Sequence, residues 1–540
     1  MKGVIAAPQV EAAEVARHIF HEGGNAVDAA VAVAFAQGVV DPQMTSLGGW
    51  GVALVFHAPS GQHLALDFCG RAPLKATPDM WASKVKRRLR FDLWELEGHI
   101  NEVGYLAVTV PGNLAGFWEL HRRFGKLPWK AVVEPAIALA EEGFVVPGEL
   151  AQMWRRPPSQ EGVLSMQEIL TSTSASARLF TKDGRLYAAG EWFRNPDYAN
   201  TLREVAQHGP QVFYEGWIAH KIVEDFARNG GLLTLEDFKT YQVKVKPPVE
   251  STYRGIRISG TPPPTSPVQV MEILNILEGF DPRDLPFGSP NYAWSMALAQ
   301  KASFADRMLH LGDPDFQPVP IDLFLSKAHA AQWREKVLRN VPFEVPGAPA
   351  PEPAHTTTIS AIDEEGTAIA ITHTLSTPAS GVVVEGLGFM FNNAMMAFHP
   401  FPGHPNSIAP GKARITGMAP VFLWKGNAPW AVASAPGGTR ILTGVLQTIV
   451  NLVDYGMTPM EAVSAPRLHC EGQQVDIEAR LYFAVKDFLV RRGLTPTKSA
   501  FSYDPLFALV HLAIREPDGR LTGAADPRGR GGLVIVEGRV

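Results

Sequence analysis

The sequence has few cysteines, little excess charge of either sign and no long apolar run. Its 540 residues contain only two cysteines, Cys69 and Cys470, which is typical of a reduced protein and excludes a disulfide-stapled scaffold. The 49 basic and 54 acidic residues give a net charge of −5, so no strong field favours nucleic acid or an anionic membrane. The sequence contains no run of about 18 apolar residues, so it predicts no membrane-spanning helix.

The N-terminal stretch turns amphipathic directly after Lys2 and lacks the apolar core of a signal peptide. A chain that had lost a leader would look the same. We therefore expect a cytoplasmic protein with neither nucleic-acid nor membrane partners.

The residues that are present predict a large mixed fold. A composition of 46% hydrophobic and 19% charged residues is that of a globular protein with a sizeable core. Periodicity predicts an amphipathic helix over residues 11–24, a buried helix over 25–40 and two strands within 47–68. The remaining predictions are helices over 111–143, 150–245 and 268–339, strands over 247–264, and a strand-rich part over 356–540 with one helix near 440–455.

A proline-rich stretch, VPFEVPGAPAPEPAH, separates the two halves of the chain at about residues 341–355. Such a composition resists both helix and sheet and predicts an exposed, extended linker. The main boundary therefore divides residues 1–355 from residues 356–540.

Three consecutive threonines, Thr356 to Thr358, follow the linker at once. TTTISAID alternates, EEG predicts a turn, and TAIAITHTL alternates again, so the segment predicts a β-hairpin. With the loop at residues 364–366, Asp363 faces Thr367 and Thr356 faces Thr374. Facing residues have Cβ atoms roughly 4.5–5.5 Å apart, so the two hydroxyls can interact.

A threonine hydroxyl at this place is a candidate nucleophile. It needs an adjacent base, and one recurring solution is the α-amine of the same residue, freed by cutting the chain before it. That amine has a pKa of roughly 7.7–8.0, which suits a base near neutral pH. The linker before Thr356 provides a segment that could be released by the cut. An ordinary strand rich in threonine is the alternative.

A second candidate element is the sequence APGGTRI between a predicted strand and a predicted helix. Gly437 and Gly438 allow backbone N–H groups to approach a ligand closely, next to a helix N-terminus that favours negative charge. This arrangement suits the oxyanion of a tetrahedral intermediate. A structural strand-to-helix turn is the alternative.

Taken together, these segments resemble the γ-glutamyltranspeptidase family of N-terminal nucleophile hydrolases. The resemblance covers nearly the whole chain, with the motifs in the family's order. The motifs are EGGNAVDAAVAVAFAQGVVDPQMTSLGG, VPGNLAGFWELHRRFGKLPWKAVVEPAIALAEEGF, FYEGWIAHKIV, NGGLLTLEDFKTY, PPPTSP, LNILEGFD, TTTISAIDEEGTAIAITHTL, NNAMMAF, APGGTRI, DYGMTPMEAVSAPRLHCE and GAADPRGRGG.

The resemblance implies an α+β fold, a four-layer αββα sandwich formed by both halves of the chain. It also implies a proenzyme that cuts itself at His355–Thr356 into a large subunit, 1–355, and a small subunit, 356–540. Thr356 would then be the nucleophile and Thr374 the threonine bonded to it, with Gly437 and Gly438 forming the oxyanion site. The family often has His at the third position of the small subunit, where this chain has Thr358, which leaves Thr357 as an alternative nucleophile.

The chain departs from the family where the γ-glutamyl group is bound. By resemblance, the family's carboxylate-binding Arg falls on Cys69 and its amine-binding Asp falls on Ala397. The remaining changed positions are Thr416 and Gly417 in place of a serine pair, Ser376 after the hairpin, and Ala394 within NNAMMAF. A buried ammonium without a carboxylate partner is costly to bind, so we expect weak glutathione hydrolysis.

Two arginines are candidates for binding a substrate carboxylate instead. Arg71 lies two residues after Cys69, on the same face of an extended chain, and Arg414 lies two residues before Thr416. A guanidinium offers a bidentate fork to a carboxylate. Structural ion pairing is the alternative for each. Cys69 itself is expected to be a small buried residue and not a reactive thiol.

The sequence therefore predicts an autoprocessing amidohydrolase that needs no cofactor, with a small acid-bearing amide as substrate and water or an amine as acceptor. The alternatives are a γ-glutamyl hydrolase or transferase with a new binding mode, an oxamate-type or acyl-amide hydrolase, and a non-catalytic ligand-binding relative. A homodimer of processed units is an alternative to a single unit. His399 and His404, in HPFPGH, are the sole metal-like spacing and have no carboxylate beside them, so we expect no catalytic metal.

Overall fold

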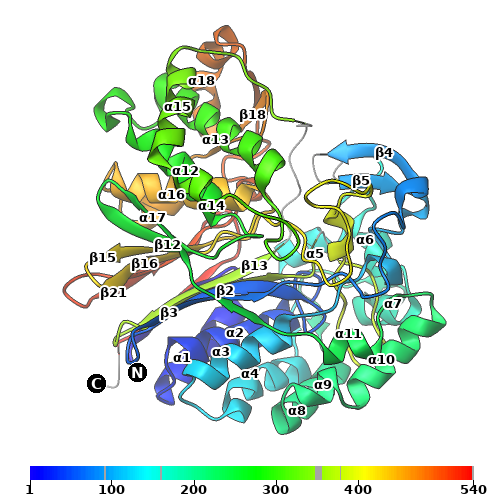
Figure 1. Ribbon diagram of the computed structural model, residues 1–540. Coiled ribbons are helices and arrows are strands. Elements are labelled where there is room, and N and C mark those ends of the chain that lie inside the picture. The colour runs from blue at the N-terminus through cyan, green and yellow to red at the C-terminus, as the bar shows by residue number, and fades with distance from the viewer. Residues whose placement is uncertain (91–92, 159–160, 347–355, 377–378, 538–540) are drawn as a thin grey trace.

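The computed structural model describes residues 1–90, 93–158, 161–346, 356–376 and 379–537. Two β-sheets lie face to face, and helices cover the outer face of each (Figure 1). The predicted four-layer αββα sandwich is therefore confirmed. No helix in these ranges is long and apolar enough to cross a membrane.

The first sheet has seven strands and combines both halves of the chain. Every neighbouring pair is antiparallel. Its order is β10 (Lys244–Lys246), β3 (Gln62–Phe68), β2 (Trp50–His57), β14 (Ala368–Thr374), β13 (Thr357–Asp363), β1 (Gly3–Ala7) and β22 (Gly532–Val536). The first and last strands of the chain are thus neighbours, and β13 and β14 lie at the centre.

The second sheet has six strands and is also antiparallel. Its order is β11 (Val249–Tyr253), β12 (Ile256–Gly260), β15 (Val421–Lys425), β16 (Ala428–Ser434), β20 (His511–Arg515) and β21 (Leu521–Ala524). Apolar side chains between the two sheets form one buried cluster. Its members include Leu54, Ile362, Ala370, Phe422, Trp424 and Val432.

Helices cover the first sheet because each presents an apolar face to it. The covering helices are α1 (Val10–His21), α2 (Ala26–Val40) and α3 (Asn113–Phe124), and α4 (Trp129–Glu142) packs on α2 behind them. Every residue of α2 is buried, as its almost entirely apolar sequence predicts. Asn25 and Asp28 form a capping box that fixes where α2 begins.

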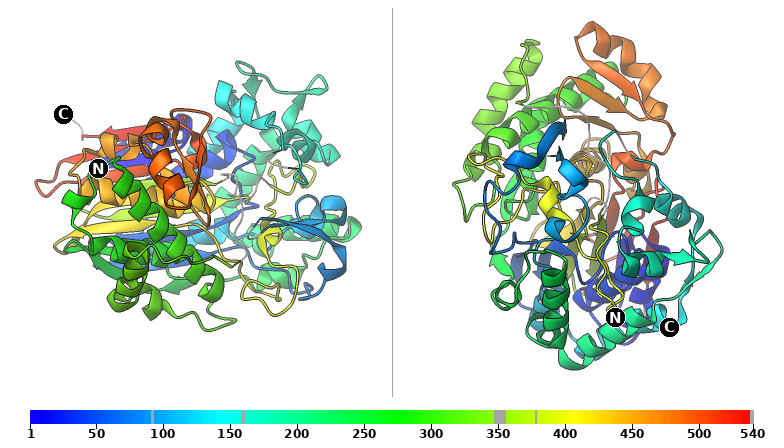
Figure 2. Two further views of the ribbon diagram at one scale, coloured as in Figure 1. Left: turned by 90° about the horizontal axis from the view of Figure 1, so that it is seen from above. Right: turned by 90° about the vertical axis from the view of Figure 1, so that its right-hand side faces the viewer.

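The second sheet is covered by α12 (Pro267–Glu278) and α16 (Arg440–Val453), with α13 (Pro290–His310) and α15 (Lys327–Leu338) packed on α12. At the opposite end of the sandwich from β15 and β16 lie β4 (Val85–Arg90), β5 (Leu93–Leu96) and α5 to α7 (Figures 1 and 2). These last helices span Gly148–Trp154, Met166–Leu170 and Ser174–Phe180.

The strand-rich part after residue 356 has more helix than the sequence predicts. The helix predicted near 440–455 is present as α16, and α17 (Pro459–Ser464) and α18 (Ala479–Arg491) are further helices that sequence analysis did not predict. α17 has six residues and starts at a Thr458–Glu461 capping box, which is too short a segment for periodicity to reveal. α18 is amphipathic and packs its apolar side on α13.

A buried ion network holds the C-terminal half together. Arg467 donates from Nη2 to Asp526 at 2.8 Å and from Nη1 to the carbonyls of Phe507 and Ala508 at 3.0 and 2.9 Å. Arg528 bonds Asp526 at 3.0 Å and Glu478 at 2.7 Å. Charges buried this completely are stable only while each is paired.

We predict that Arg467→Met lowers the free energy of unfolding by about 3–5 kcal/mol, because Asp526 and two buried carbonyls would each lose a donor. Urea unfolding followed by tryptophan fluorescence measures it. The control, Arg228→Met, removes a largely exposed ion pair on α10 (Trp217–Arg228) and should cost under about 1 kcal/mol. Equal losses in the two variants would contradict the prediction.

Candidate active site

Each of the three threonines after the linker has a different environment. Thr356 lies just before β13 and lines a cavity. The Thr357 hydroxyl accepts from Gln37 of α2 at 2.8 Å, on the helix-covered face of the sheet. The Thr358 hydroxyl donates to Ser434 of β16 at 2.6 Å, on the opposite face. Alternation along the strand explains the difference.

The hairpin has the register that the sequence predicts. Thr357 pairs with His373 and Thr358 with Thr372, and Thr367 donates its N–H to the Asp363 carboxylate. Thr356 and Thr374 are the next residues along the two strands. The structure therefore brings the candidate nucleophile and its predicted neighbour to the same end of the hairpin.

Residues after β14 form a hydrogen-bonded cluster around Thr374. The Ser376 N–H donates to the Thr374 hydroxyl at 2.8 Å, and Trp50 Nε1 donates to the Ser376 hydroxyl at 2.9 Å. Ser376 has φ = 86°, a conformation that costs a non-glycine residue energy and persists only where its surroundings impose it. Trp50 pairs with Thr374 across β2 and β14, so the three side chains form one unit.

The predicted strand–turn–helix at APGGTRI is present between β16 and α16. Gly437 has φ = 145° and Gly438 has φ = 61°, values that other residues rarely adopt. A Cβ on Gly437 would lie 2.7 Å from the Ala508 side chain, and a Cβ on Gly417 would lie 2.3 Å from the Gly438 carbonyl oxygen. The turn is therefore enclosed by two other segments at close contact, before a 14-residue helix.

A cavity of about 1130 Å³ opens at Thr356 and reaches Pro436, the residue before the glycine turn. Its walls mix apolar and charged side chains. The apolar residues are Met44, Leu150, Met153, Phe501, Leu506 and Leu509, and the charged residues are Asp41, Glu149, Arg155, Arg156, Asp504, Arg528 and Arg530. A volume of this size accommodates a substrate much larger than a single amino acid.

The sequence model of the Gamma-glutamyltranspeptidase family matches residues 12–536. The chain belongs to this family. It is 35% identical to the glutathione hydrolase proenzyme of Escherichia coli K12, over 98% of this chain and 90% of the relative. It is 34% identical to the acylase ACY 1 proenzyme of Pseudomonas sp. strain SE83, over 99% of this chain and 94% of the relative.

Among solved structures, a cephalosporin acylase from Bacillus halodurans matches with a TM-score of 0.88. The match has 29% identity and covers 100% of this chain and 96% of the acylase. This γ-glutamyltranspeptidase family member is therefore an enzyme of the N-terminal nucleophile hydrolase type, and the alternative of a non-catalytic relative is set aside.

Cys69, at the position expected for the family's carboxylate-binding Arg, and Arg71, two residues further on, are both buried. Arg71 pairs with Asp67 at 2.8 Å and lies 3.6 Å from Asp313. Burial opposes ionisation of Asp67, but Arg71 and Lys246 outweigh it and hold the pKa of that carboxyl well below its usual range. The charge of Arg71 is thus balanced within the protein, which matches the ion-pairing alternative.

Cys69 is unsuited to nucleophilic chemistry. Burial and the nearby Asp67 raise the pKa of its thiol well above the usual value, and the thiolate is the reactive form. Its side chain belongs to the same apolar cluster as Trp50 and Ala394. The expectation of a small buried residue is therefore confirmed.

Arg414 contacts Trp50, which belongs to the hydrogen-bonded cluster around Thr374. Its guanidinium stacks over the Trp50 ring, 4.9 Å from the ring centroid, and donates to the Ile415 carbonyl at 2.9 Å. The side chain is half-buried. Through Trp50 it is connected to Ser376 and Thr374, so Arg414 is the better placed of the two candidate carboxylate ligands.

The segments that carry Ala397 and Thr416 are hydrogen-bonded to each other and to the start of α12. Asn406 donates to the Ala397 carbonyl at 2.6 Å and accepts from the Ile415 N–H at 3.0 Å. The Thr416 carbonyl accepts from Ser266 at 2.7 Å. Ala397 is buried, and no carboxylate replaces the one expected at its position in the family.

Sequence analysis missed the polar network beneath the hairpin. Gln37 donates to Thr357 and to Gln9, and its carbonyl oxygen lies 2.7 Å from His373 Nε2. His373 Nδ1 lies 2.8 Å from the Thr45 hydroxyl. The signal was present, because Gln37 and Asp28 are the two polar residues of an otherwise apolar helix, and a buried amide needs partners.

His399 and His404 do stack, with ring centroids 4.3 Å apart. Within the described ranges, however, neither belongs to a group of three metal-ligating side chains.

The expected cut site is the bond between His355 and Thr356. His355 and the linker from residue 347 lie outside the described residues.

We predict that the network makes folding sensitive to acid. Burial lowers the pKa of His373 to about 3, whereas an unfolded-state imidazole has a pKa of roughly 6.5. As the pH falls, the unfolded chain binds this proton first, so stability is lost below about pH 6.5 and further toward pH 3. Between pH 7.5 and 5, wild type should lose about 2 kcal/mol more than His373→Gln.

Urea midpoints at the two pH values measure this difference. The control is His208→Asn, an exposed residue at the end of α8 (Pro196–His208), which should follow the wild-type pH dependence. Parallel pH curves for wild type and His373→Gln would show that the buried imidazole does not set the acid sensitivity.

Proposed function

We propose that this enzyme is an autoprocessing amidohydrolase in which Thr356 becomes the N-terminal nucleophile. The observation that carries the proposal is the position of Thr356, which lines a large cavity together with Pro436, the residue before the glycine turn, and which the hairpin register sets level with Thr374. Similarity to relatives that are named proenzymes supports the self-cleavage.

Processing would start from the uncut chain. The Thr356 hydroxyl attacks the carbonyl carbon of His355, the C–N bond breaks, and the nitrogen takes up the proton to become the new α-amine. The resulting ester is hydrolysed by water, which leaves a carboxylate on His355 and a free hydroxyl on Thr356. Gly437 and Gly438 are the proposed oxyanion donors in this step.

Turnover would reuse the same groups. The α-amine takes the proton of the Thr356 hydroxyl as that oxygen attacks the amide carbon of the substrate. The tetrahedral oxyanion is stabilised by the glycine turn at the start of α16. The α-ammonium gives this proton to the nitrogen of the substrate amide, the C–N bond breaks and the amine half leaves. Water or an amine acceptor then attacks the acyl-enzyme ester and frees the Thr356 hydroxyl. Thr374, held by the Ser376 N–H, would orient the nucleophile.

The substrate would be an amide of an acid that lacks an α-amine. Arg414, whose guanidinium stacks over Trp50, is the proposed ligand of the substrate carboxylate, whereas Ala397 and Ala394 offer no counter-ion for an ammonium group. Similarity to both glutathione hydrolase and acylase proenzymes supports a pocket open to either specificity. The second candidate is a γ-glutamyl transferase or hydrolase in which Thr416 and Ser376 bind the amino acid.

The two halves of the substrate would lie on opposite sides of β13. Trp50, Ser376 and Arg414 lie toward β14 and β2, whereas the cavity is lined by residues next to β1 and β22, including Gln9 and Arg530. We assign the acyl group to the first side and the leaving amine to the cavity. Its volume, about 1130 Å³, leaves room for a bulky amine half.

We predict that purified wild type gives two fragments, the smaller beginning Thr-Thr-Thr-Ile-Ser. Thr356→Ala should remain a single chain of 58.7 kDa without amidase activity, because it lacks the attacking oxygen. Thr356→Ser is the matched control and should still be cut. Intact mass and N-terminal sequencing distinguish the outcomes: a start at Thr357 would move the nucleophile by one residue, and an uncut wild type would contradict self-cleavage.

We also predict the acyl preference. Glutaryl-p-nitroanilide and γ-glutamyl-p-nitroanilide differ by the α-amine alone. We expect a kcat/KM at least about tenfold higher for the glutaryl compound, because an unpaired buried ammonium costs about 1.4 kcal/mol or more. The double variant Cys69→Arg, Ala397→Asp should narrow or reverse that ratio. A wild type that prefers the γ-glutamyl compound would favour the second candidate.

A further inference from the structure

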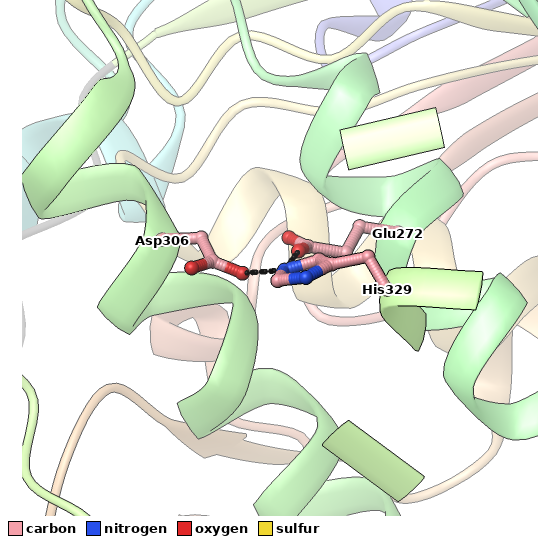
Figure 3. Close-up of side chains that lie close together, drawn as sticks. All are labelled: Glu272, Asp306 and His329. Carbon is pink, nitrogen blue, oxygen red and sulfur yellow. Dashed lines mark hydrogen bonds and ion pairs between the residues drawn. The ribbon is translucent and has the colours of Figure 1, made fainter. Parts of the chain in front are cut away.

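Outside the active site, three metal-ligating side chains from three helices converge at one point (Figure 3). Glu272 lies on α12, Asp306 on α13 and His329 on α15. His329 Nε2 is 2.6 Å from Asp306 Oδ2 and 3.6 Å from Glu272 Oε1. The potential ligand atoms of the three all lie within 4.8 Å of one another, and no other such group occurs in the ranges the structure describes.

Glu272 is the unusual member of the cluster. Its side chain is 0% exposed, and neither carboxylate oxygen has a hydrogen-bond partner within the described part of the chain. The carboxylate points at His329 and Asp306 (Figure 3). A buried carboxylate without donors is costly, so Glu272 is stable at this place only with a bound proton or with a cation beside it.

The charges around Glu272 also favour a bound proton or a bound cation. Asp306 is also buried and accepts from Trp333 Nε1 at 2.7 Å. The side chain of His329 is 19% exposed, which gives solvent a path to the cluster. Two carboxylates and one imidazole are neutral together either with two bound protons or with one divalent cation.

We propose that Glu272, Asp306 and His329 bind a divalent transition-metal cation of the Zn²⁺ type. One imidazole nitrogen and two carboxylate oxygens are ligands that such ions accept. Zn²⁺ bonds of about 2.0–2.2 Å place tetrahedral ligands roughly 3.4 Å apart, so the Glu272–His329 spacing already fits. Asp306 Oδ2 and His329 Nε2 must move apart by about 0.8 Å to reach this spacing. The Trp333 N–H then continues to donate to the Asp306 carboxylate, outside the metal coordination.

The cation would be structural, because none of its three ligands lines the cavity at Thr356. It would join α15, the last helix before the linker, to α12 and α13. Next to Asp306, Arg307 donates to Ser266 at 2.9 Å, and Ser266 donates in turn to the Thr416 carbonyl. Binding would therefore stiffen the helix layer behind the Thr416–Gly417 segment.

The test is titration of the full chain with Zn²⁺ after EDTA treatment and buffer exchange, followed by calorimetry, with Co²⁺ absorption as a second readout of the ligand set. We expect one Zn²⁺ per chain and a higher Tm when it is bound. His329→Asn and Glu272→Gln should each weaken binding at least about 100-fold. Both are close in shape to the native residues, and either one suffices if the other fails to fold.

The matched control is the double variant His399→Asn, His404→Asn. It removes the two stacked histidines outside the proposed site and should leave the affinity for Zn²⁺ unchanged. Three results would overturn the proposal. They are no saturable Zn²⁺ binding by wild type, equal binding by wild type and both ligand variants, and loss of binding in the control alone. Amide hydrolysis should persist after chelation, since the Thr356 chemistry uses no metal.

Discussion

The position of the candidate nucleophile depends on the pairing of β13 with β14 at the centre of the first sheet. Both strands are buried over their full length, and their faces differ in chemistry. Thr357 bonds Gln37 of the helix layer, whereas Thr358 bonds Ser434 of the second sheet. A slip of one residue would exchange these faces and leave buried hydroxyls unpaired. The register is therefore strongly determined, and Thr356 and Thr374 share one end of the hairpin as a consequence.

The glycine turn is fixed by packing from outside its own segment. Ala508 leaves no space for a side chain on Gly437, and the Gly438 carbonyl closely abuts Gly417. Arg467 holds the Ala508 carbonyl from the buried ion network. A group that stabilises a developing charge must be in place before the reaction starts. Arg467 and its buried partners therefore help to fix the position of Ala508, and through Ala508 the position of the glycine turn.

Sequence patterns predicted the features whose causes are local. The β13–β14 hairpin follows from alternation around Glu364–Gly366, and the burial of α2 follows from its composition. Features built from distant segments were not predictable in this way. Gln37 meets Thr357 across 320 positions of the chain, and the cavity joins α5 to the loop around Phe501. Periodicity carries no information on such contacts, which depend on how the layers pack.

The elements that carry the candidate catalytic residues are separate from the positions expected to bind the substrate, so one fold can accept different substrates. The threonine pair and the glycine turn sit on elements whose geometry the sheets impose, so changes elsewhere leave them in place. The positions expected to bind a γ-glutamyl group, Cys69 and Ala397, hold small buried side chains in place of the charged ones expected from the family. A charged side chain at either position would carry a desolvation cost that its binding partner on the substrate must offset. Uncharged residues at these two positions therefore fit a change of specificity that leaves the candidate catalytic residues in place.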